Sequence, residues 1–571
     1  MKVSDCIARN LRRFTDTIFG ITGGAIVNVF DSIASLDFRL ITPNHEQAAA
    51  MMADAFSRLR SSKGQIGVVI ATSGPGATNL LTGTACSYFD SIPVLIITGQ
   101  VPSMHLRKGV VRQVGFQEID VVTAFTPVTK FAARICSVDQ VKSVFDAALT
   151  ALFNGRGGPV LVDICDDVQR MEMDDINFEV APLQFELDNE WEKKLATFQS
   201  YLVGAKRPVF IVGAGVKLGK CEETVLRLAK KWQIPVALTW GTLDLLDDSD
   251  TFNLRDFGIA AQRATNFVIQ EADLLICLGT RLDTHETGAD FSTFAPHAKK
   301  VVVDIDQSEL DRLAPGVDIT LRVTIEWFVH NVSHLECNFF DWLVIARSLR
   351  SMLPICPNAY YDQKSINPYA FMKSLSQVAP TNAIIVTDAG CTVVWTMQGW
   401  EVKLGQTLFT AFNNSPMGYA FPASIGAYYA DSSRPIICIT GDGGLNMNIQ
   451  EMALLKTTNV KVFVLNNGGY GMMRQTQDTW LNSRYVATDG PFADELKVAN
   501  AYDIRAHLLS VTDDLKYLDT ILHSRGPSIT KVSIDKAQRI EPKLVFGKSI
   551  EYSSPDLTDA QILGIRRYLN E

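Results

Sequence analysis

The sequence lacks the features of a membrane-spanning, nucleic-acid-binding or disulfide-stabilised protein. Its apolar runs all fall short of the roughly 18 residues that a membrane helix needs, so we expect no membrane span. Lys and Arg number 53 against 62 Asp and Glu, and the net charge of −9 argues against a nucleic-acid partner, because phosphate binding needs a positive field. The ten cysteines form no C-x-x-C pair, and residues 1–14 lack the apolar stretch of a secretory signal. Together these features predict a cytoplasmic protein.

The sequence is rich in short, continuously apolar runs with many β-branched residues. Such runs without alternation are typical of strands buried on both faces, as in a parallel sheet. Helical patterns lie between them, for example at 46–60 and 141–153. This alternation predicts an α/β fold of doubly wound parallel sheets. The predicted strands lie at 66–71, 94–98, 209–212, 274–278, 301–305, 384–387, 436–440 and 462–465.

The 571 residues are too many for one hydrophobic core, since cores rarely grow beyond roughly 250–300 residues. We therefore predict three domains, at 1–172, 190–335 and 365–545, followed by a tail at 546–571. An acidic stretch at 174–189 is the first predicted linker. An irregular stretch at 331–367, which contains Pro354 and Pro357, is the second. The alternative, a single large sheet, is disfavoured by length.

Residues 441–473 carry a pattern that suits a metal ion. The motif Gly-Asp-Gly-Gly at 441–444 follows one predicted strand, and Asn467 follows the next, with a helix expected from about Met447. Neighbouring parallel strands would bring Asp442 and Asn467 together at their carboxyl ends, where open α/β sheets bind ligands. These two side chains and the Gly469 carbonyl are hard oxygen donors that suit Mg²⁺. Alternatively, the first motif is an ordinary turn and the second an ordinary strand end.

In these motifs the sequence resembles the thiamine-diphosphate (ThDP) enzymes, specifically the acetolactate-synthase-like carboligases. The longest matching segment is TSGPGATNLLTGTACSYFDSIPVLIITGQVP at 72–102. The resemblance runs over about residues 1–545. It implies a pyrimidine-binding domain, a central FAD-binding-like domain and a diphosphate- and Mg²⁺-binding domain, in that order. It also implies ThDP and Mg²⁺ as cofactors, with binding residues at Gly390, Thr392, Asp442, Gly443, Gly444, Asn467 and Gly469.

The segment PNHEQAAAMMADAFSR matches the family's segment for the carboxylate that activates the cofactor, and it places Glu46 there. On residue pattern alone, a glutamate in the first turn of a helix also fits a simple dipole interaction. Met417, in NNSPMGYAFPASIGA, matches the apolar wedge that bends the cofactor, although methionine is also an ordinary core residue. The resemblance further implies that one subunit supplies Glu46 and another the diphosphate site, so that the enzyme is a homodimer or homotetramer.

Other positions match family residues that approach the reacting centre. Gly23, Gly24, Ala25 and Gln100 are among them, and Phe116 and Gln117 lie in the GFQE motif that lines the substrate channel.

The central domain carries a pattern that fits a flavin. Gly213 and Gly215 follow a strand as in a dinucleotide-binding turn, although G-x-G alone is weak and also fits an NAD-dependent dehydrogenase. The segment GTRLDTHETGADF resembles the one by which this family holds FAD, and a second segment lies beside the adenosine. A structural FAD is therefore expected, held through Gly213, Gly215, Arg281, Thr287, Gly288, Asp304 and Asp306.

The chain departs from true acetolactate synthases at two acceptor-recognition positions. His285 stands where they have the second arginine of their R-F-D-D-R-V-T-G motif, and Thr476 stands where they have a tryptophan. Arginine is the natural clamp for a carboxylate. The segment after Gly390 also lacks the usual Gln-His pair, and Thr392 stands near its place.

From this we expect an enzyme that decarboxylates pyruvate and transfers the two-carbon acetyl unit to a bulky ketone. A nucleotide-activated 4-keto-deoxy sugar is the favoured acceptor, as in yersiniose-type branched sugars of surface polysaccharide. The alternatives are acetolactate synthase, which uses a second 2-keto acid, a simple decarboxylase, and a catalytically silent homologue.

Overall fold

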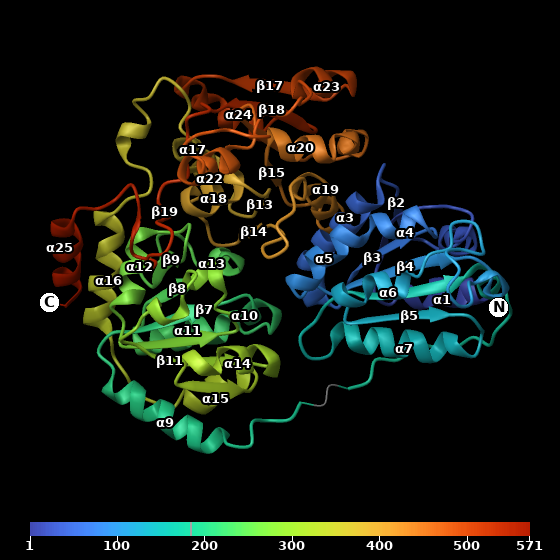
Figure 1. Cartoon of the computed structure of the whole chain (residues 1–571), viewed down its shortest axis with the longest axis horizontal. Helices are drawn as coiled ribbons and strands as arrows, with labels where there is room; N and C mark the ends of the chain where they lie inside the picture. The colour runs from blue at the N-terminus through green and yellow to red at the C-terminus, as the bar shows by residue number, and fades with distance from the viewer. Residues whose placement is uncertain (183–184, 571) are drawn as a thin grey trace.

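Three parallel six-stranded sheets divide the chain into three α/β domains, as the sequence predicted (Figure 1). The computed structural model describes residues 1–182 and 185–570. The first and third sheets share one strand order, β2-β1-β3-β4-β6-β5 and β14-β13-β15-β16-β18-β17. The middle sheet runs β12-β11-β10-β7-β8-β9. The strand order changes direction between β1 and β3 in the first sheet, between β7 and β10 in the second, and between β13 and β15 in the third. Doubly wound sheets bind ligands at these points.

The central strands of the N-terminal domain are buried along their length, because they are rich in Val and Ile and are covered on both faces of the sheet. Its strands are β1 (Thr17–Ile21), β2 (Arg39–Ile41), β3 (Gly67–Ala71), β4 (Val94–Gln100), β5 (Phe131–Ile135) and β6 (Val160–Cys165). Its helices are α1 (Val3–Leu11), α2 (Val27–Ala34), α3 (Glu46–Arg60), α4 (Pro75–Asn79), α5 (Leu81–Phe89), α6 (Val121–Phe125), α7 (Gln140–Phe153) and α8 (Asp166–Gln169).

The middle domain follows a described stretch without helix or strand; the predicted linker at 174–189 includes residues 183 and 184, which lie outside the described residues. Its strands are β7 (Pro208–Val212), β8 (Val236–Leu238), β9 (Asn253–Asp256), β10 (Leu274–Leu278), β11 (Lys299–Asp304) and β12 (Ile319–Arg322). Its helices are α9 (Trp191–Gly204), α10 (Gly215–Leu218), α11 (Glu222–Trp232), α12 (Arg263–Gln270), α13 (Thr284–Thr287), α14 (Gln307–Leu313), α15 (Ile325–Val332) and α16 (Phe340–Met352).

The C-terminal domain repeats the plan of the first. Its strands are β13 (Ile384–Thr387), β14 (Thr407–Phe409), β15 (Ile436–Gly441), β16 (Lys461–Asn466), β17 (Arg505–Leu509) and β18 (Ser528–Ser533). Its helices are α17 (Pro368–Val378), α18 (Cys391–Gly399), α19 (Ala420–Ala430), α20 (Asp442–Met447), α21 (Met452–Leu455), α22 (Gly471–Trp480), α23 (Glu495–Ala501) and α24 (Leu518–Leu522).

Two segments differ from the prediction. The stretch 331–367 is not irregular throughout: it contains α16, whose residues Trp342, Ala346 and Leu349 are buried in the middle domain. The chain also returns to the middle domain after β18, through β19 (Lys543–Leu544), β20 (Ser553–Ser554) and α25 (Asp559–Asn570). The Leu544 amide donates to the Ile259 carbonyl at 2.7 Å. The middle domain is therefore completed by the chain end, which the predicted boundary at 545 separates from it.

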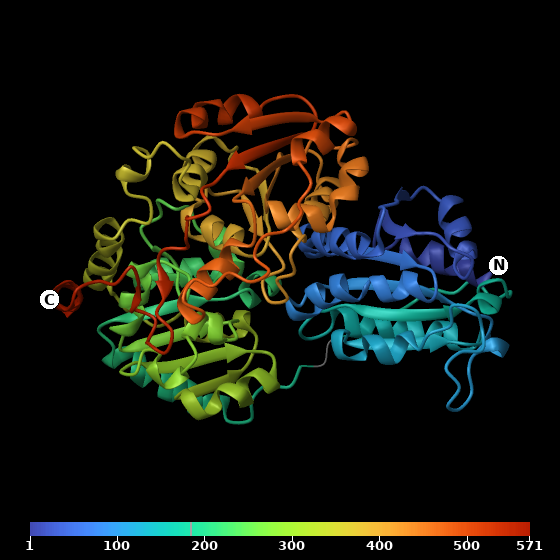
Figure 2. The same ribbon diagram turned by 45° about the horizontal axis from the view of Figure 1, so that its top comes forward.

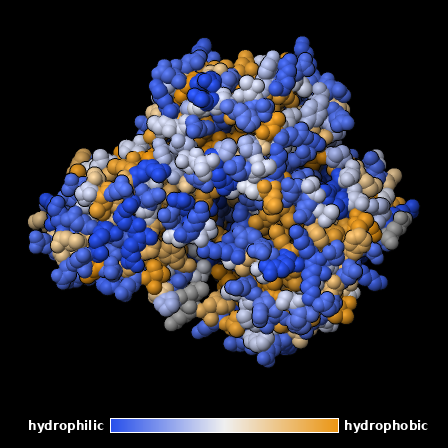
Figure 3. All heavy atoms as spheres, turned by 180° about the vertical axis from the view of Figure 1, so that it is seen from behind, coloured by the Kyte–Doolittle hydropathy of each residue, from blue (hydrophilic) through white to orange (hydrophobic). Residues whose placement is uncertain are grey.

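The N-terminal and C-terminal domains pack together through α3 and α19, which lie side by side (Figure 1). Both helices are rich in alanine, so their backbones approach closely: a Cβ added to Gly426 would lie 2.3 Å from the Met52 carbonyl oxygen. Hydrophilic residues are spread widely over the face seen in Figure 3. Among the described residues no helix combines the length and apolarity needed to cross a membrane.

Candidate active site

The predicted metal residues meet at the carboxyl edge of the third sheet. Strands β15 and β16 are parallel neighbours, with Gly441 opposite Leu465, so Asp442 and Asn467 follow adjacent strands. The Asp442 carboxylate accepts hydrogen bonds from the Gly443 amide at 2.8 Å and from the Gly469 amide at 3.1 Å. The structure thus brings together the three residues predicted to bind the metal.

The donor set at this edge fits Mg²⁺. Asp442 is 4% exposed, and burial raises its pKa to about 6. A cation beside it would stabilise the ionised form of this carboxylate. Asn467 is 6% exposed, and its side chain makes no hydrogen bond to any residue in the described ranges. Within 1–182 and 185–570 no group of three or more His, Cys, Asp or Glu could hold a metal. The site therefore depends on amide and carbonyl oxygens, which Mg²⁺ accepts.

The loop that carries Asn467 and Gly469 is held by an arginine that the sequence analysis missed. Gly468 and Gly469 have φ values of +64° and +151°, which favour glycine. Arg474, on the following helix α22, donates to the Asn467 carbonyl at 3.2 Å and to the Gly468 carbonyl at 2.7 Å, and it pairs with Asp489. An arginine that follows the N-N-G-G turn by one helical turn is the signal that could have identified it.

The predicted diphosphate residues surround the reversal point between β13 and β15. Gly390 has a φ of +76°, and α18 starts directly after it. The Thr392 side chain lies in this first turn, 3.4 Å from where a Cβ on Gly441 would sit. Helix α20 begins at Asp442, so the prediction of a helix from about Met447 is wrong. The N-termini of α18 and α20 thus both lie at this point, and the first-turn amides of a helix favour an anionic group such as a diphosphate.

Gly443, Gly444 and Met417 are close-packed here. A Cβ on Gly443 would lie 3.1 Å from the Met417 Cε atom, and one on Gly444 would lie 2.6 Å from an Asp388 carboxylate oxygen. Asp388 is a second residue that the sequence analysis missed. It accepts from the Ala389 amide, the Gly418 amide and the Thr440 hydroxyl, and burial raises its pKa to about 6. It links the loop that carries Met417 to the diphosphate turn.

Glu46 lies at the first position of α3, where it was predicted. The Asn79 side-chain amide donates to its Oε2 atom at 2.9 Å, and its Oε1 atom lies beside Gly76. Glu451 of the C-terminal domain fixes the approach to this helix, since both its oxygens accept from the Asn44 amide, at 3.0 and 3.1 Å. Burial raises the pKa of Glu451 to about 7. Sequence analysis missed Asn79 and Glu451.

The structure does not bring Glu46 onto the metal motif of its own chain. No hydrogen bond joins Glu46 to Asp442, Asn467 or the Gly390 turn within the described residues. Gly24 is exposed after β1, at the reversal point of the first sheet, and Phe116 and Gln117 lie on the loop after β4. This loop projects away from the C-terminal domain (Figure 2).

Phe116 is exposed, whereas Gln117 is held by a close contact with Gly74. Phe116 is 84% exposed, and Gln117 has a φ of +62° and packs against Gly74. Gln100 lies at the end of β4. It is fully buried, and its amide donates to the Ile119 carbonyl at 2.9 Å and to Asp163 at 3.1 Å. Its role is to support the loop from beneath.

Three of the residues predicted for FAD, Gly213, Gly215 and Arg281, follow β7 and β10 at the reversal point of the middle sheet. Gly213 and Gly215 donate their amides to the Leu278 and Gly279 carbonyls, both at 2.9 Å. A Cβ on Gly213 would lie 2.3 Å from the Gly279 oxygen, so chain packing alone requires a glycine here. The place suits a dinucleotide, but these two glycines are explained without one.

The remaining predicted flavin residues are held by local contacts. Arg281 donates to Asp283 at 2.7 Å and to Asn413 at 2.6 Å, and the Thr287 hydroxyl donates to the Asp283 carbonyl. Gly288 has a φ of +83°. The remaining two acidic residues follow β11: Asp304 accepts from the Asp306 amide at 2.9 Å, and Asp306 pairs with Arg156 at 3.1 Å.

The two positions that depart from the family pattern are also internally packed. The His285 ring lies 4.2 Å from that of Trp240, and burial lowers its pKa, so the imidazole is neutral at pH 7. The Thr476 hydroxyl donates to the Met472 carbonyl at 3.0 Å within α22. Neither residue can act as the bidentate carboxylate clamp that an arginine would provide.

Comparisons with known proteins agree with this geometry. Three family models match: the N-terminal TPP binding domain of thiamine pyrophosphate enzymes at 1–124, their central domain at 195–331, and their C-terminal TPP binding domain at 388–532. The chain therefore belongs to the thiamine pyrophosphate enzymes, which act with ThDP (thiamine pyrophosphate). It is an enzyme of the type that decarboxylates pyruvate and joins the product to an acceptor.

Its relatives include acetolactate synthases from bacteria and archaea. The chain is 32% identical to the acetolactate synthase isozyme 2 large subunit of Escherichia coli, over 94% of this chain and 95% of that one. It is 32% identical to a probable acetolactate synthase large subunit of Methanocaldococcus jannaschii, over 92% and 90%. It is 31% identical to the acetolactate synthase large subunit of Lactococcus lactis, over 93% and 92%.

Proposed function

We propose that this protein is an acetolactate synthase-type carboligase that uses pyruvate as donor and a second 2-keto acid as acceptor. The observation that carries the proposal is the cluster of Asp442, Asn467 and Gly469 beside the Gly390 turn, in a chain whose relatives are named acetolactate synthases. In this proposal Asp442, Asn467 and the Gly469 carbonyl hold Mg²⁺. Bound ThDP supplies the carbon nucleophile that makes decarboxylation of a 2-keto acid possible.

The chain's own residues would bind and orient the cofactor. The first-turn amides of α18 and α20 and the Thr392 hydroxyl offer hydrogen bonds to the diphosphate. Met417 presents an apolar surface next to Gly443, on which the bent cofactor would rest. The Asn79 side-chain amide donates to the Oε2 atom of Glu46. The Oε1 atom of Glu46 would then share a proton with a ring nitrogen of the cofactor.

We further propose that the site forms between two subunits. Within the described residues Glu46 makes no hydrogen bond to the metal motif of its own chain, and the loop with Phe116 projects outward (Figure 2). Met104, Val110, Val114 and Phe116 on this loop are each more than half exposed, which is unusual for side chains of this size unless they are covered by a partner. A second copy of the chain would cover the loop and bring its own Asp442 to Glu46.

A second candidate acceptor is favoured by His285 and Thr476. A neutral histidine replaces the expected carboxylate clamp, and a threonine leaves more room than a tryptophan. Both changes suit a larger ketone that lacks a carboxylate, such as a nucleotide-activated 4-keto-deoxy sugar. The names of the relatives favour the keto acid, so the sugar is the second choice.

A competition assay tests the acceptor. The purified enzyme receives ThDP, Mg²⁺ and pyruvate, with 2-ketobutyrate and a nucleotide 4-keto-deoxy sugar at equal concentration, and the products are separated by mass spectrometry. We expect acetolactate and acetohydroxybutyrate as the main products. If the branched sugar nucleotide were the main product, the result would support the second acceptor instead. Absence of CO₂ release from pyruvate would contradict both.

FAD and cellular location are further parts of the proposal. The Gly213 and Gly279 turns lie where a dinucleotide binds, and a structural FAD at Arg281 and Asp304 fits that place. Flavin released on denaturation would support it, and a colourless protein would not. The ten free cysteines fit a reducing cytoplasm.

A further inference from the structure

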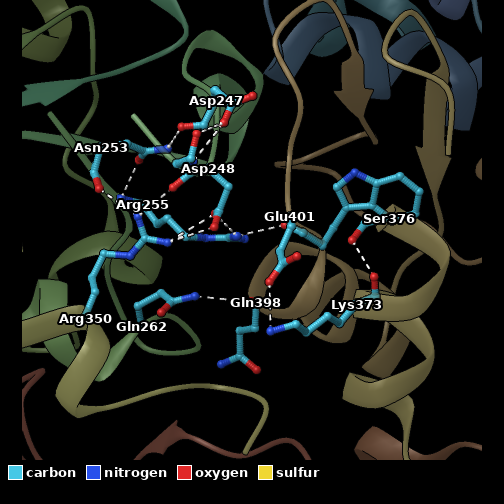
Figure 4. A network of polar contacts seen from close by, with 12 residues as sticks. Asp247, Asp248, Asn253, Arg255, Gln262, Arg350, Lys373, Ser376, Gln398 and Glu401 are labelled. Carbon is cyan, nitrogen blue, oxygen red and sulfur yellow. Dashed lines mark hydrogen bonds and ion pairs between the residues drawn. The ribbon is translucent and has the colours of Figure 1, made fainter. Parts of the chain in front are cut away.

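A cavity of about 290 Å³ lies between the middle and C-terminal domains, away from the candidate active site. Helix α16 and the segment from Asp248 to Gln262 form one wall, and helices α17 and α18 form the other, as Figure 4 shows from close by. Its charged lining consists of Asp248, Arg255, Arg347, Arg350, Lys373 and Glu401. None of these residues belongs to the sites described above.

The cavity carries more positive than negative charge. Four cations face two carboxylates, which leaves an excess of two positive charges. Asp248 pairs with Arg255 and, at 3.1 Å, with Arg350, and Lys373 pairs with Glu401 at 3.0 Å. Arg347 pairs with no carboxylate in the described part of the chain: it donates only to the Asp248 carbonyl, at 3.3 Å.

Arg255 is held in an unusual conformation at the wall of this cavity. It has a φ of +68°, rare for a residue with a long side chain, and it is 3% exposed. Its terminal nitrogens donate to the Trp400 carbonyl at 2.8 Å and the Met397 carbonyl at 2.7 Å, at the end of α18. Its buried Nε has no partner among the residues the structure describes. An unpaired buried N–H of a cation is costly, so this group lacks an acceptor.

The charges around Arg350 also favour a bound anion. Burial and, to a smaller extent, the neighbouring guanidinium groups of Arg255 and Arg347 lower the pKa of Arg350 to about 10, although Asp248 opposes them. Lys373 and Glu401, on the opposite wall, balance each other. Like charges held this closely are unfavourable without a counter-charge, and an anion between them would relieve the repulsion.

We propose that this cavity binds a small phosphate-type anion. A guanidinium group can donate two parallel hydrogen bonds to phosphate oxygens. The N–H groups of Arg347 and the Nε–H of Arg255 are available as donors. The volume lies at the lower end of the range for small-molecule sites, which excludes a dinucleotide and suits inorganic phosphate, diphosphate or the phosphate of one nucleotide. The anion would join α16 of the middle domain to α17 and α18 of the C-terminal domain. The proposal does not depend on the proposed acceptor.

Thermal unfolding of the holoenzyme tests the site. The protein is saturated with ThDP and Mg²⁺, so that the diphosphate site is filled, and is titrated with phosphate, diphosphate or AMP at constant ionic strength, with chloride as reference. A ligand that binds only the folded state raises Tm, and we expect a rise of about 2 °C or more at 10 mM phosphate. The anion that raises Tm at the lowest concentration is the one that the cavity binds most tightly.

Two variants assign the effect to this cavity. Arg347→Gln removes the unpaired cation, and Ser351→Asp adds a negative charge at an exposed position of the cavity wall. Both should lose the rise in Tm. The control, Arg227→Gln, removes an exposed arginine paired with Glu223 and should keep it. No rise in the wild type, or an equal rise in all four proteins, would overturn the proposal.

Discussion

The Tyr419 hydroxyl of the C-terminal domain donates a hydrogen bond to the Asp54 carboxylate of the N-terminal domain. Arg58 pairs with the same carboxylate at 2.7 Å and with Asp90 at 2.7 Å. The Asp90 carboxylate in turn accepts a hydrogen bond from the Phe412 amide at 2.8 Å, which is a second hydrogen bond between the N-terminal and C-terminal domains. This buried network lies beside the α3–α19 packing and fixes how the helix with Glu46 sits on the C-terminal domain.

Arg58→Met should destabilise the protein strongly. It removes the only cation that the network shows in the described residues and leaves two buried carboxylates, and loss of one partner of a buried ion pair costs about 3–5 kcal/mol. Denaturant unfolding measures the change. Arg227→Met, which breaks an exposed pair, should change stability by less than about 1 kcal/mol. Equal effects would show that burial of this network does not matter.

Gly426→Ala should separate α3 from α19. The added Cβ would lie 2.3 Å from the Met52 carbonyl oxygen, and backbone must shift to admit it, which costs about 1–3 kcal/mol. Gly564→Ala is the matched control: it also lies in a helix, α25, but its Cβ meets nothing within 4 Å. That variant should be stabilised by up to about 1 kcal/mol. Thermal melts of both variants check the contrast.

Glu46→Gln should lower CO₂ release from pyruvate about 100-fold or more while the fold stays intact, because the amide cannot exchange the proton. The amide oxygen can still accept from Asn79, so the geometry is kept. Steady-state assays measure the rate, and circular dichroism monitors the fold. Glu223→Gln, at an exposed helix position, should leave the rate unchanged. Unchanged turnover in Glu46→Gln would place the activating group elsewhere.

Asp442→Asn should weaken Mg²⁺-dependent ThDP binding by at least about tenfold, because the site loses its one carboxylate. Calorimetric titration of ThDP, with and without Mg²⁺, measures this. EDTA should release ThDP from the wild type and have little further effect on the variant. Asp503→Asn, at an exposed pair with Lys456, serves as control. If the wild type binds ThDP equally well without metal, the assignment of the metal residues fails.

Glu451→Gln should flatten the dependence of stability on pH. Burial raises the pKa of Glu451 to about 7, above its ordinary value near 4.3, so the folded chain holds a proton that the unfolded chain has released. The contribution of this group to stability is therefore present at low pH and falls as pH rises from about 4 to 7, by up to about 3 kcal/mol.

Urea midpoints at pH 5, 6, 7 and 8 measure this effect. Glutamine can still accept from the Asn44 amide, so the variant should be less destabilised between pH 5 and 7 than the wild type. Glu223→Gln should follow the wild type. A wild-type slope unchanged by Glu451→Gln would mean that Glu451 is already ionised at low pH.

The sequence by itself determined eight of the strands, the helix at 46–60 and the order of the three domains. Runs of Val and Ile demand burial wherever they lie, and the Gly-Asp-Gly and Asn-Asn motifs end two such runs, so their meeting at one sheet edge followed from parallel pairing. Glu46 was likewise found in the first turn of the helix in which local pattern and family resemblance placed it.

The tertiary structure alone decided the contacts made by residues far apart in the chain. The Gln100 amide donates to the Ile119 carbonyl and to Asp163, contacts that no local sequence pattern indicates. Glu451 holds Asn44, and α16 and α25 complete the middle domain, although no local pattern links these segments. A hydrogen bond or a packed face needs a partner, and which partner lies within reach depends on how the sheets are stacked. Periodicity within a segment does not contain that information.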